Sequence, residues 1–142
     1  MNKYQTISAL ALMFTLLLAA CGGSSSTPQP GTAWNLSSLT SAGQAIELSA
    51  PRPVTLEIGD KNQVGGSAGC NTYFGELKFS AGGKLEVGPI GMTEMWCEDG
   101  MQVEAAFGEA MGAVTEYQLS AASLTLSSPD GQYLLVFTPL AE

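Results

Sequence analysis

The stretch "LTLSSPDGQYLLVF", residues 124–137, contains two short runs of strand-forming residues on either side of a turn sequence. The first run, 124–128, alternates apolar and polar residues, and the second, 133–137, is rich in apolar and aromatic residues. The pair Asp130-Gly131 between them is typical of tight hairpin turns. The stretch therefore predicts an antiparallel hairpin near the end of the chain.

Similar short runs precede this hairpin along the chain. Apolar and polar residues alternate in "VTLEI" (54–58), "ELKF" (76–79) and "KLEV" (84–87). Turn sequences with glycine occur at Gly59-Asp60 and at Gly82-Gly83. Short alternating runs with regular turns favour an antiparallel sheet that is either a small barrel or strongly bent.

One segment has helical spacing instead. In 98–114, apolar residues recur three and four positions apart and form one stripe of a helix. Asp99, with Gln102 three residues later, resembles a capping box and predicts the start of that helix. The stripe consists of Val103, Ala106, Phe107, Ala110, Met111 and Val114. One helix packed on a sheet gives an α+β domain that is mostly β.

The N-terminus has the features of a secretory leader. Lys3 is followed by an apolar run that ends in "LAAC", residues 18–21. Small residues before Cys21 resemble the bacterial lipobox, in which the cysteine carries lipid. The alternative is ordinary cleavage with Cys21 left as a free thiol. We expect a signal peptide at 1–20, a lipid anchor and flexible linker at 21–32, and one domain at 33–142.

Composition limits the partners. The chain has 5 basic and 13 acidic residues, a net charge of −8, and removal of Lys3 with the leader would leave −9. Nucleic acid is therefore not an expected partner, because binding it depends on Lys and Arg. Anionic lipid headgroups would also repel the chain, so the lipid on Cys21 is expected to hold it at the membrane.

The expected location is the bacterial cell envelope. The residue directly after Cys21 is Gly22 and not Asp, a pattern that resembles lipoproteins sorted to the outer membrane, facing the periplasm, if the host has two membranes. We expect the domain to be monomeric there.

Histidine is absent from the whole sequence. This excludes Ser-His-Asp and Cys-His catalytic pairs and the usual zinc ligand sets. Glu47, Glu57, Glu76 and Glu86 mostly occupy the outward positions of alternating strands, which suits a solvated face better than an active site. The glycine-rich "GGSAG" (65–69) lacks the Lys-Ser/Thr of a phosphate loop and is better explained as a bulge or tight corner. We expect no enzymatic activity and no cofactor.

Two cysteines remain once Cys21 is lipidated. In an extracytoplasmic setting Cys70 and Cys97 are expected to form a disulfide. The alternative is a soft-metal or redox site, because methionine and cysteine sulfurs select Cu(I). Its ligands would be Met92, Met95, Cys97 and Cys70. At strand spacing Met92 would face away from Met95 and Cys97, so such a site needs a bend.

These segments together resemble the META domain of the HslJ-like heat-shock lipoproteins. The resemblance rests on "TAWNLSSL" (32–39), "GGSAGCNTYFGEL" (65–77), "GPIGMTEMWC" (88–97) and "EAAFGEAMGAVTEYQLSAASLTLSSPDGQYLLVF" (104–137) in that order. It covers about residues 33–138. It implies a compact β-rich domain with one helix, found in envelope proteins linked to stress or drug tolerance. It implies no catalytic residue.

The same resemblance singles out candidate contact residues. Asn71, Tyr73 and Phe74 match the central motif of the family, and Met95 and Trp96 lie in the second one. Asn71 has a structural alternative, which is to cap a short turn with its side chain. Trp96 departs from the family pattern, where a small residue is expected, and an exposed Trp would mark a contact site.

Three functions follow as hypotheses. The first is a non-enzymatic, lipid-anchored envelope protein that binds an unknown protein partner or acts in stress or drug tolerance. The second is the soft-metal or redox protein described above. The third is an inhibitor of a cationic enzyme such as lysozyme, which an acidic chain would attract electrostatically.

Overall fold

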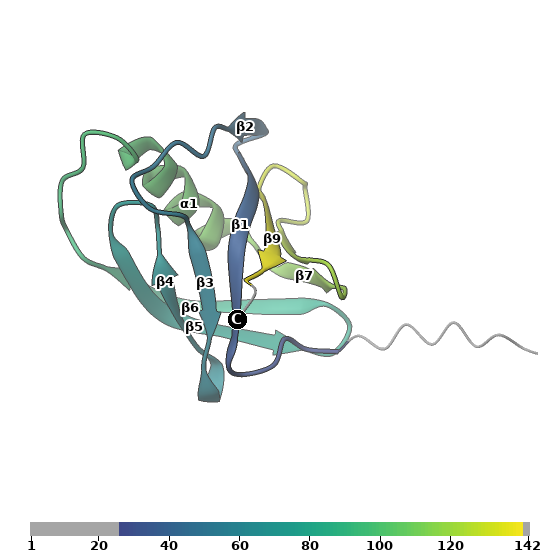
Figure 1. Ribbon diagram of the computed structural model, residues 1–142. Coiled ribbons are helices and arrows are strands. Elements are labelled where there is room, and N and C mark those ends of the chain that lie inside the picture. The colour runs from purple at the N-terminus through teal and green to yellow at the C-terminus, as the bar shows by residue number, and fades with distance from the viewer. Residues whose placement is uncertain (1–25, 141–142) are drawn as a thin grey trace, which may run out of the picture.

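The computed structural model describes residues 26–140, which form nine strands, one α-helix and a short 3-10 turn (Figure 1). The elements in chain order are β1 (Thr32–Ser41), β2 (Gln44–Ile46), β3 (Thr55–Ile58), η1 (Asp60–Asn62), β4 (Gln63–Ser67), β5 (Thr72–Ser80), β6 (Lys84–Met92), α1 (Met101–Ala113), β7 (Glu116–Leu119), β8 (Leu124–Ser127) and β9 (Leu134–Pro139).

The strands close into a barrel. All neighbours pair antiparallel, in the order β2-β1-β3-β4-β5-β6-β7-β8-β9, and β1 also pairs with β9. Eight strands thus form the ring, and the short β2 adds a second partner to one end of β1. Closure removes most of the free strand edges that would otherwise invite association. The prediction of a mostly β, barrel-like α+β domain is confirmed.

The predicted turns connect neighbouring strands of the ring. Gly59-Asp60 lies between β3 and β4, Gly82-Gly83 between β5 and β6, and Asp130-Gly131 between β8 and β9. In the last turn the Asp130 carboxylate accepts hydrogen bonds from the Ser128 hydroxyl (2.6 Å) and the Gln132 N–H (3.1 Å). These hydrogen bonds lower the pKa of the Asp130 carboxyl.

Four strands were not predicted from the alternation of residues: β1, β2, β4 and β7. The longest of them, β1, buries Trp34, Leu36 and Leu39, a spacing of two and then three. The spacing changes from two to three because the register of β1 with β9 shifts between Leu36 and Ser38. An irregularity of this kind inserts a residue and interrupts the period of two on which strand prediction depends.

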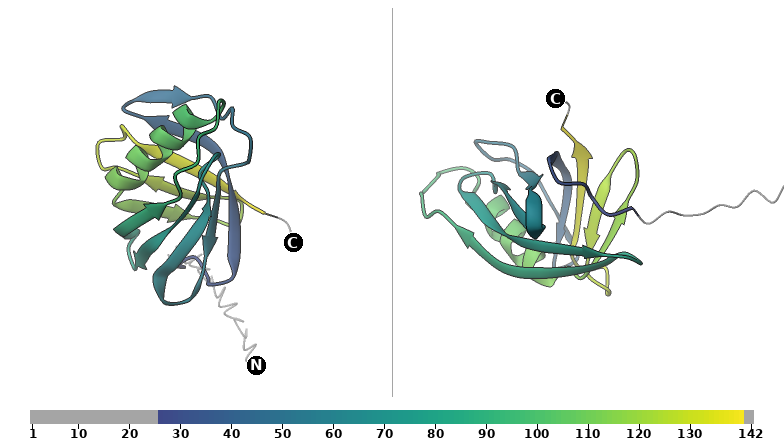
Figure 2. Two further views of the ribbon diagram at one scale, coloured as in Figure 1. Left: turned by 90° about the vertical axis from the view of Figure 1, so that its left-hand side faces the viewer. Right: turned by 90° about the horizontal axis from the view of Figure 1, so that it is seen from below.

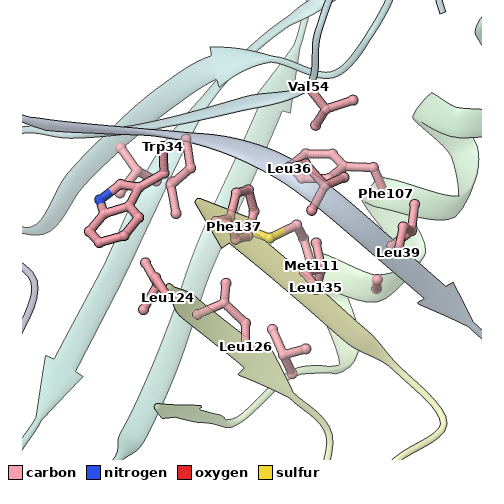
Figure 3. Packing of buried hydrophobic residues seen from close by; sticks show 14 of the residues in the cluster. Trp34, Leu36, Leu39, Val54, Phe107, Met111, Leu124, Leu126, Leu135 and Phe137 are labelled. Atoms are coloured by element: carbon pink, nitrogen blue, oxygen red, sulfur yellow. The ribbon is translucent and has the colours of Figure 1, made fainter. Parts of the chain in front are cut away.

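The barrel interior and the buried face of α1 form one hydrophobic core (Figure 3). Phe107 and Met111 from α1 lie among Leu36, Leu135 and Phe137 from the strands. All six residues of the predicted helical stripe are buried. The helix therefore supplies part of the hydrophobic core that fills the barrel.

The predicted start of the helix was wrong. The N-cap is Gly100 and not Asp99, and no side chain caps the helix. Gly100 adopts a left-handed backbone, φ 99°, and a Cβ there would lie 2.8 Å from Pro51 Cδ. Glycine is the residue that tolerates both the backbone angle and this close packing.

The barrel has its shortest strand pairing between β6 and β7. Their ladder contains the single pair Lys84↔Glu116, which also forms an ion pair at 3.3 Å. The chain between these two strands is the loop 93–100 followed by α1. The loop lies at one end of the barrel (Figure 2).

The opposite end of the barrel holds the beginning of the described chain. Pro28 is buried there, and the Gly31 N–H donates a hydrogen bond to the Ile58 carbonyl at 2.7 Å. A hollow of about 200 Å³ lies at this end. Its lining residues are Thr27, Pro28, Pro30, Ile58, Gly59, Lys61, Asn62, Leu77 and Phe79.

The predicted linker therefore needs a correction. Pro28 is buried against the barrel, the Gly31 N–H bonds to the Ile58 carbonyl, and Thr32 already belongs to β1, so the end of the predicted linker is part of the folded domain. The predicted signal peptide, Cys21 and the first linker residues lie outside the described residues. Within 26–140, no helix is long and apolar enough to cross a membrane.

Candidate functional site

A disulfide joins Cys70 to Cys97, with the two Cα atoms 5.9 Å apart. It connects the turn between β4 and β5 to the loop 93–100, and so confirms the predicted pair. Neither sulfur is available as a thiolate in this oxidised state. The cysteines therefore drop out of the Cu(I) ligand set considered from the sequence, because a metal ligand must be the thiolate.

Asn71 fixes the same loop from inside. Its side chain is 1 % exposed, and its amide oxygen accepts hydrogen bonds from the Met95 N–H (2.7 Å) and the Thr93 hydroxyl (2.8 Å). Its amide nitrogen donates to the Met95 carbonyl (2.9 Å) and to Glu104 Oε1 (3.0 Å). The nitrogen also donates to Cys70 Sγ at 3.6 Å. Both polar atoms of the Asn71 side chain are thus satisfied, and together they hold both backbone groups of Met95.

Glu104 extends this network into the helix. Its Oε2 accepts a hydrogen bond from the Asn71 backbone N–H at 2.7 Å. Because Glu104 lies in the first turn of α1, its negative charge also suits the positive end of the helix dipole. The start of β5, the loop and the helix are therefore tied together at one point.

Tyr73 and Phe74 lie on opposite faces of β5. Tyr73 is 1 % exposed, packs on Phe107 with ring centroids 5.0 Å apart, and donates its hydroxyl to the Thr55 carbonyl at 2.8 Å. Burial raises the pKa of the Tyr73 phenol, and the charge of Glu57 raises it further. As a core residue, Tyr73 does not offer the surface expected of a contact residue.

Phe74 is 62 % exposed on the outer face, across from Gly91 of β6. A Cβ at Gly91 would lie 2.6 Å from the Phe74 ring. Because side chains alternate between the two faces of β5, the Phe74 ring lies outside the barrel while the Tyr73 ring lies inside.

A groove of about 500 Å³ lies where β6, the loop and the start of α1 meet. It is lined by Asn71, Met92, Thr93, Glu94, Met95, Trp96, Met101 and Glu104. Trp96 is 82 % exposed and Met95 is 55 % exposed. The groove thus brings together Asn71, Met95 and Trp96 of the predicted contact residues, and leaves out Tyr73 and Phe74.

The groove is rich in methionine. Residues 26–140 contain four methionines, and three of them, Met92, Met95 and Met101, line it. The chain leaves the sheet at Met92, so the loop bends instead of continuing as a strand. This bend brings Met92 and Met95 to one groove, although strand spacing would place them on opposite faces.

The surroundings of the groove are acidic. Glu94, Glu98 and Asp99 are exposed in the loop, and Glu104 follows in the helix. No Lys or Arg of residues 26–140 lines the groove, and Arg52, which donates to the carbonyl of the neighbouring Cys70, lies outside it. Among the described residues, no group of three or more His, Cys, Asp or Glu could hold a metal ion. The charge here favours a positively charged ligand.

Sequence reasoning did not select Thr93 and Glu104 as site residues. Met101 and Glu104 are three positions apart on the predicted helix and so share a face. The sequence gives no sign that this helix face lines a groove together with the loop 93–100.

The comparisons agree with the fold. The family model for the META domain matches residues 27–140. A protein structure solved by NMR superposes with a TM-score of 0.56 at 23% identity, covering 76% of this chain and 88% of that one. A crystal structure of a DUF4847-family protein from Bacteroides vulgatus superposes with a TM-score of 0.53 at 12% identity, covering 76% and 92%. No curated protein matched in sequence.

Proposed function

The chain belongs to the META-domain family, and from this premise we propose that it is a non-enzymatic envelope protein that binds a protein partner through the groove beside Trp96. In this proposal Cys21 carries lipid and holds the domain at the membrane surface, in the outer membrane facing the periplasm if the host has two membranes. A role in stress or drug tolerance would be exercised through that partner.

The observation that carries the proposal is the exposure of Trp96. A tryptophan that is 82 % exposed in water offers a large apolar area to a partner, and tryptophan is enriched among residues that dominate binding energy. The disulfide and Asn71 hold the loop that carries it. A loop that is already ordered loses less conformational entropy on binding.

The chemistry of the groove indicates what kind of partner fits. Methionines adapt their shape to different apolar side chains and are common on surfaces that accept amphipathic segments. Glu94, Glu98 and Asp99 around the groove would attract Lys and Arg. The partner we propose is therefore a basic segment with apolar anchors.

Site-specific photo-crosslinking in the bacterium tests this proposal. A photoreactive phenylalanine analogue replaces Trp96 in one strain and Phe74 in another, since both are exposed aromatics and only Trp96 lines the groove. We expect a discrete protein adduct from position 96 and none from position 74, with an adduct yield that falls at high salt. No adduct at 96, or the same adduct from both positions, would contradict the groove as the binding surface.

The anchor has its own test. Replacing Cys21 with Ala should abolish incorporation of labelled fatty acid and move the protein from the membrane fraction to the soluble fraction. Retention of the label in the Cys21→Ala chain would sink this part of the proposal without affecting the groove.

Inhibition of a cationic enzyme is a second candidate function, favoured by the acidic loop and the absence of Lys and Arg after Lys84. Lysozyme is the probe. The full chain in detergent should reduce lysozyme activity at low ionic strength and lose that effect at high salt, where charges are screened. An unchanged rate at low salt would remove this candidate.

A further inference from the structure

We propose that the groove is also a binding site for one soft monovalent cation, Cu(I) or Ag(I), held by the thioethers of Met92, Met95 and Met101 beside the ring of Trp96. This goes beyond the binding of a protein partner, because it assigns a ligand of a different chemical class to the same residues. It also differs from the site considered from the sequence, which needed cysteine thiolates.

The first argument is the donor set. Thioether sulfurs are soft ligands that select Cu(I) over hard divalent cations. Three of the four methionines in the described domain line one groove, and the fourth, Met111, is 1 % exposed in the core. Methionines serving only as core filler would be expected to resemble Met111 in their burial, whereas Met95 is 55 % exposed.

The second argument is the state of the cysteines. With Cys70 and Cys97 joined in a disulfide, the soft donors left in the described domain are thioethers. A thioether carries no proton to lose, so its binding to a metal does not compete with protonation as a thiol does. Such a site works in an oxidising compartment, where a pair of free thiols would be converted to a disulfide.

The third argument is the charge and the aromatic ring. Glu94 and Glu104 line the groove with the methionines. The Glu104 carboxylate is engaged by Asn71, so it supplies negative potential and keeps its place. The face of a Trp ring attracts a nearby cation, and Trp96 is the ring that lines this groove. Three neutral thioether sulfurs with carboxylates nearby favour binding of a cation that carries a single positive charge.

The test is a Cu(I) titration of the full chain, purified in detergent under anaerobic conditions with the disulfide intact. A coloured Cu(I) chelator competes for the metal and reports the affinity and the stoichiometry. We expect one Cu(I) per chain, displacement by Ag(I), no displacement by Zn(II), and a change in Trp fluorescence that the Trp96→Phe chain lacks. Absence of Cu(I) uptake by the unaltered chain would overturn the proposal.

Leucine substitutions separate metal binding from partner binding. Leu and Met have similar volumes, so Met92→Leu, Met95→Leu and Met101→Leu keep the groove apolar while removing the sulfur. Each single change removes a direct ligand and should weaken Cu(I) binding by at least about 10- to 100-fold, the range typical of losing even an outer-shell contact at a metal, and the triple change should abolish it. Met111→Leu is the matched control and should bind Cu(I) as the unaltered chain does.

The triple variant also keeps the two proposals distinguishable. If it loses Cu(I) and still gives the adduct at position 96, both are supported. If it retains Cu(I) uptake, the metal site is wrong, whatever the adduct shows. If it binds no Cu(I) and the adduct never forms in any chain, the proposed partner is wrong and the metal site stands.

Discussion

Asn71 shows how one buried amide can position a whole loop. Because its oxygen and nitrogen satisfy both backbone groups of Met95, removing them leaves buried polar groups without partners. Asn71→Ala should therefore lower the free energy of unfolding by about 3 kcal/mol, measured by urea denaturation. Asn35→Ala is the control, because the Asn35 amide makes one bond of 3.4 Å and should cost less than about 0.5 kcal/mol. Equal losses in the two variants would refute this role.

Tyr73 makes stability depend on pH in the alkaline range. Burial raises the pKa of its phenol above the usual value of 10.0, so above that pH the unfolded chain loses the proton and the folded chain keeps it. The contribution is complete below pH 10 and declines as the pH rises further, by up to about 1.4 kcal/mol per pH unit.

Tyr73→Phe removes this decline together with the hydrogen bond to Thr55. At pH 8 the variant should be less stable than the unaltered chain by about 1 kcal/mol. Above pH 10 the difference should shrink steadily in urea denaturation curves. A difference that stays constant from pH 8 to 11 would show that the phenol does not titrate as its burial requires.

At the scale of elements, the disulfide closes a long loop that contains both β5 and β6. A separation of 27 residues corresponds to about 3–4 kcal/mol of stability through the entropy of the unfolded chain. The Cys70→Ser, Cys97→Ser double variant should unfold at correspondingly lower urea concentration while keeping its β-sheet circular dichroism. Mass spectrometry should show two alkylated thiols in the unaltered domain only after reduction, and labelling without reduction would contradict the pair.

Two glycines in different elements should respond to alanine in opposite ways. Gly108 in α1 has open space around a Cβ, so Gly108→Ala should raise the free energy of unfolding by about 0.5–1 kcal/mol through better helix propensity. Gly66 in β4 has φ +148°, and a Cβ there would clash with the Thr55 carbonyl. Gly66→Ala should cost at least about 2 kcal/mol. Thermal denaturation of both variants checks the two signs together.

Sequence reasoning succeeded where the periodicity of an element was regular. The stripe of α1 and the strands on either side of Asp130-Gly131 were recovered because local spacing decides them. It failed for β1, where an irregular register breaks the period, and for β4, where the glycines of "QVGGS" hide the alternation. The groove was only half anticipated, because Asn71 meets Met95 and Glu104 through tertiary hydrogen bonds between distant segments, which local sequence does not encode.

At the scale of the molecule, the groove and the start of the described chain lie at opposite ends of β5. At the first end of β5, the Thr72 N–H donates a hydrogen bond to the Thr93 hydroxyl of the loop (3.1 Å). Near its last end, Phe79 lines the same hollow as Pro28. Nine residues of strand span about 27–30 Å. We propose that, if Cys21 carries lipid, the domain stands on the bilayer with the groove at its far end.

Energy transfer to a lipid-borne acceptor tests this orientation. Trp34→Phe is made in every chain used, because Trp34 would otherwise emit as well. In vesicles carrying the lipidated Trp34→Phe protein, emission from Trp96 should transfer poorly to dansyl-labelled lipid. A chain with Ala81→Trp and Trp96→Phe places the donor at the turn between β5 and β6, at the other end, and should transfer strongly. Equal transfer from both positions would show that the domain lies flat on the membrane.

The same proposed orientation would limit which molecules the groove can meet. Neighbouring copies standing on one bilayer would hold their grooves in parallel, at the same height, so that no groove could meet another groove. Any occupant would have to arrive from the aqueous side, as a diffusing ion or chain or as part of a surface facing that bilayer. In this proposal the closed barrel would act as a spacer that sets the distance between the bilayer and the groove.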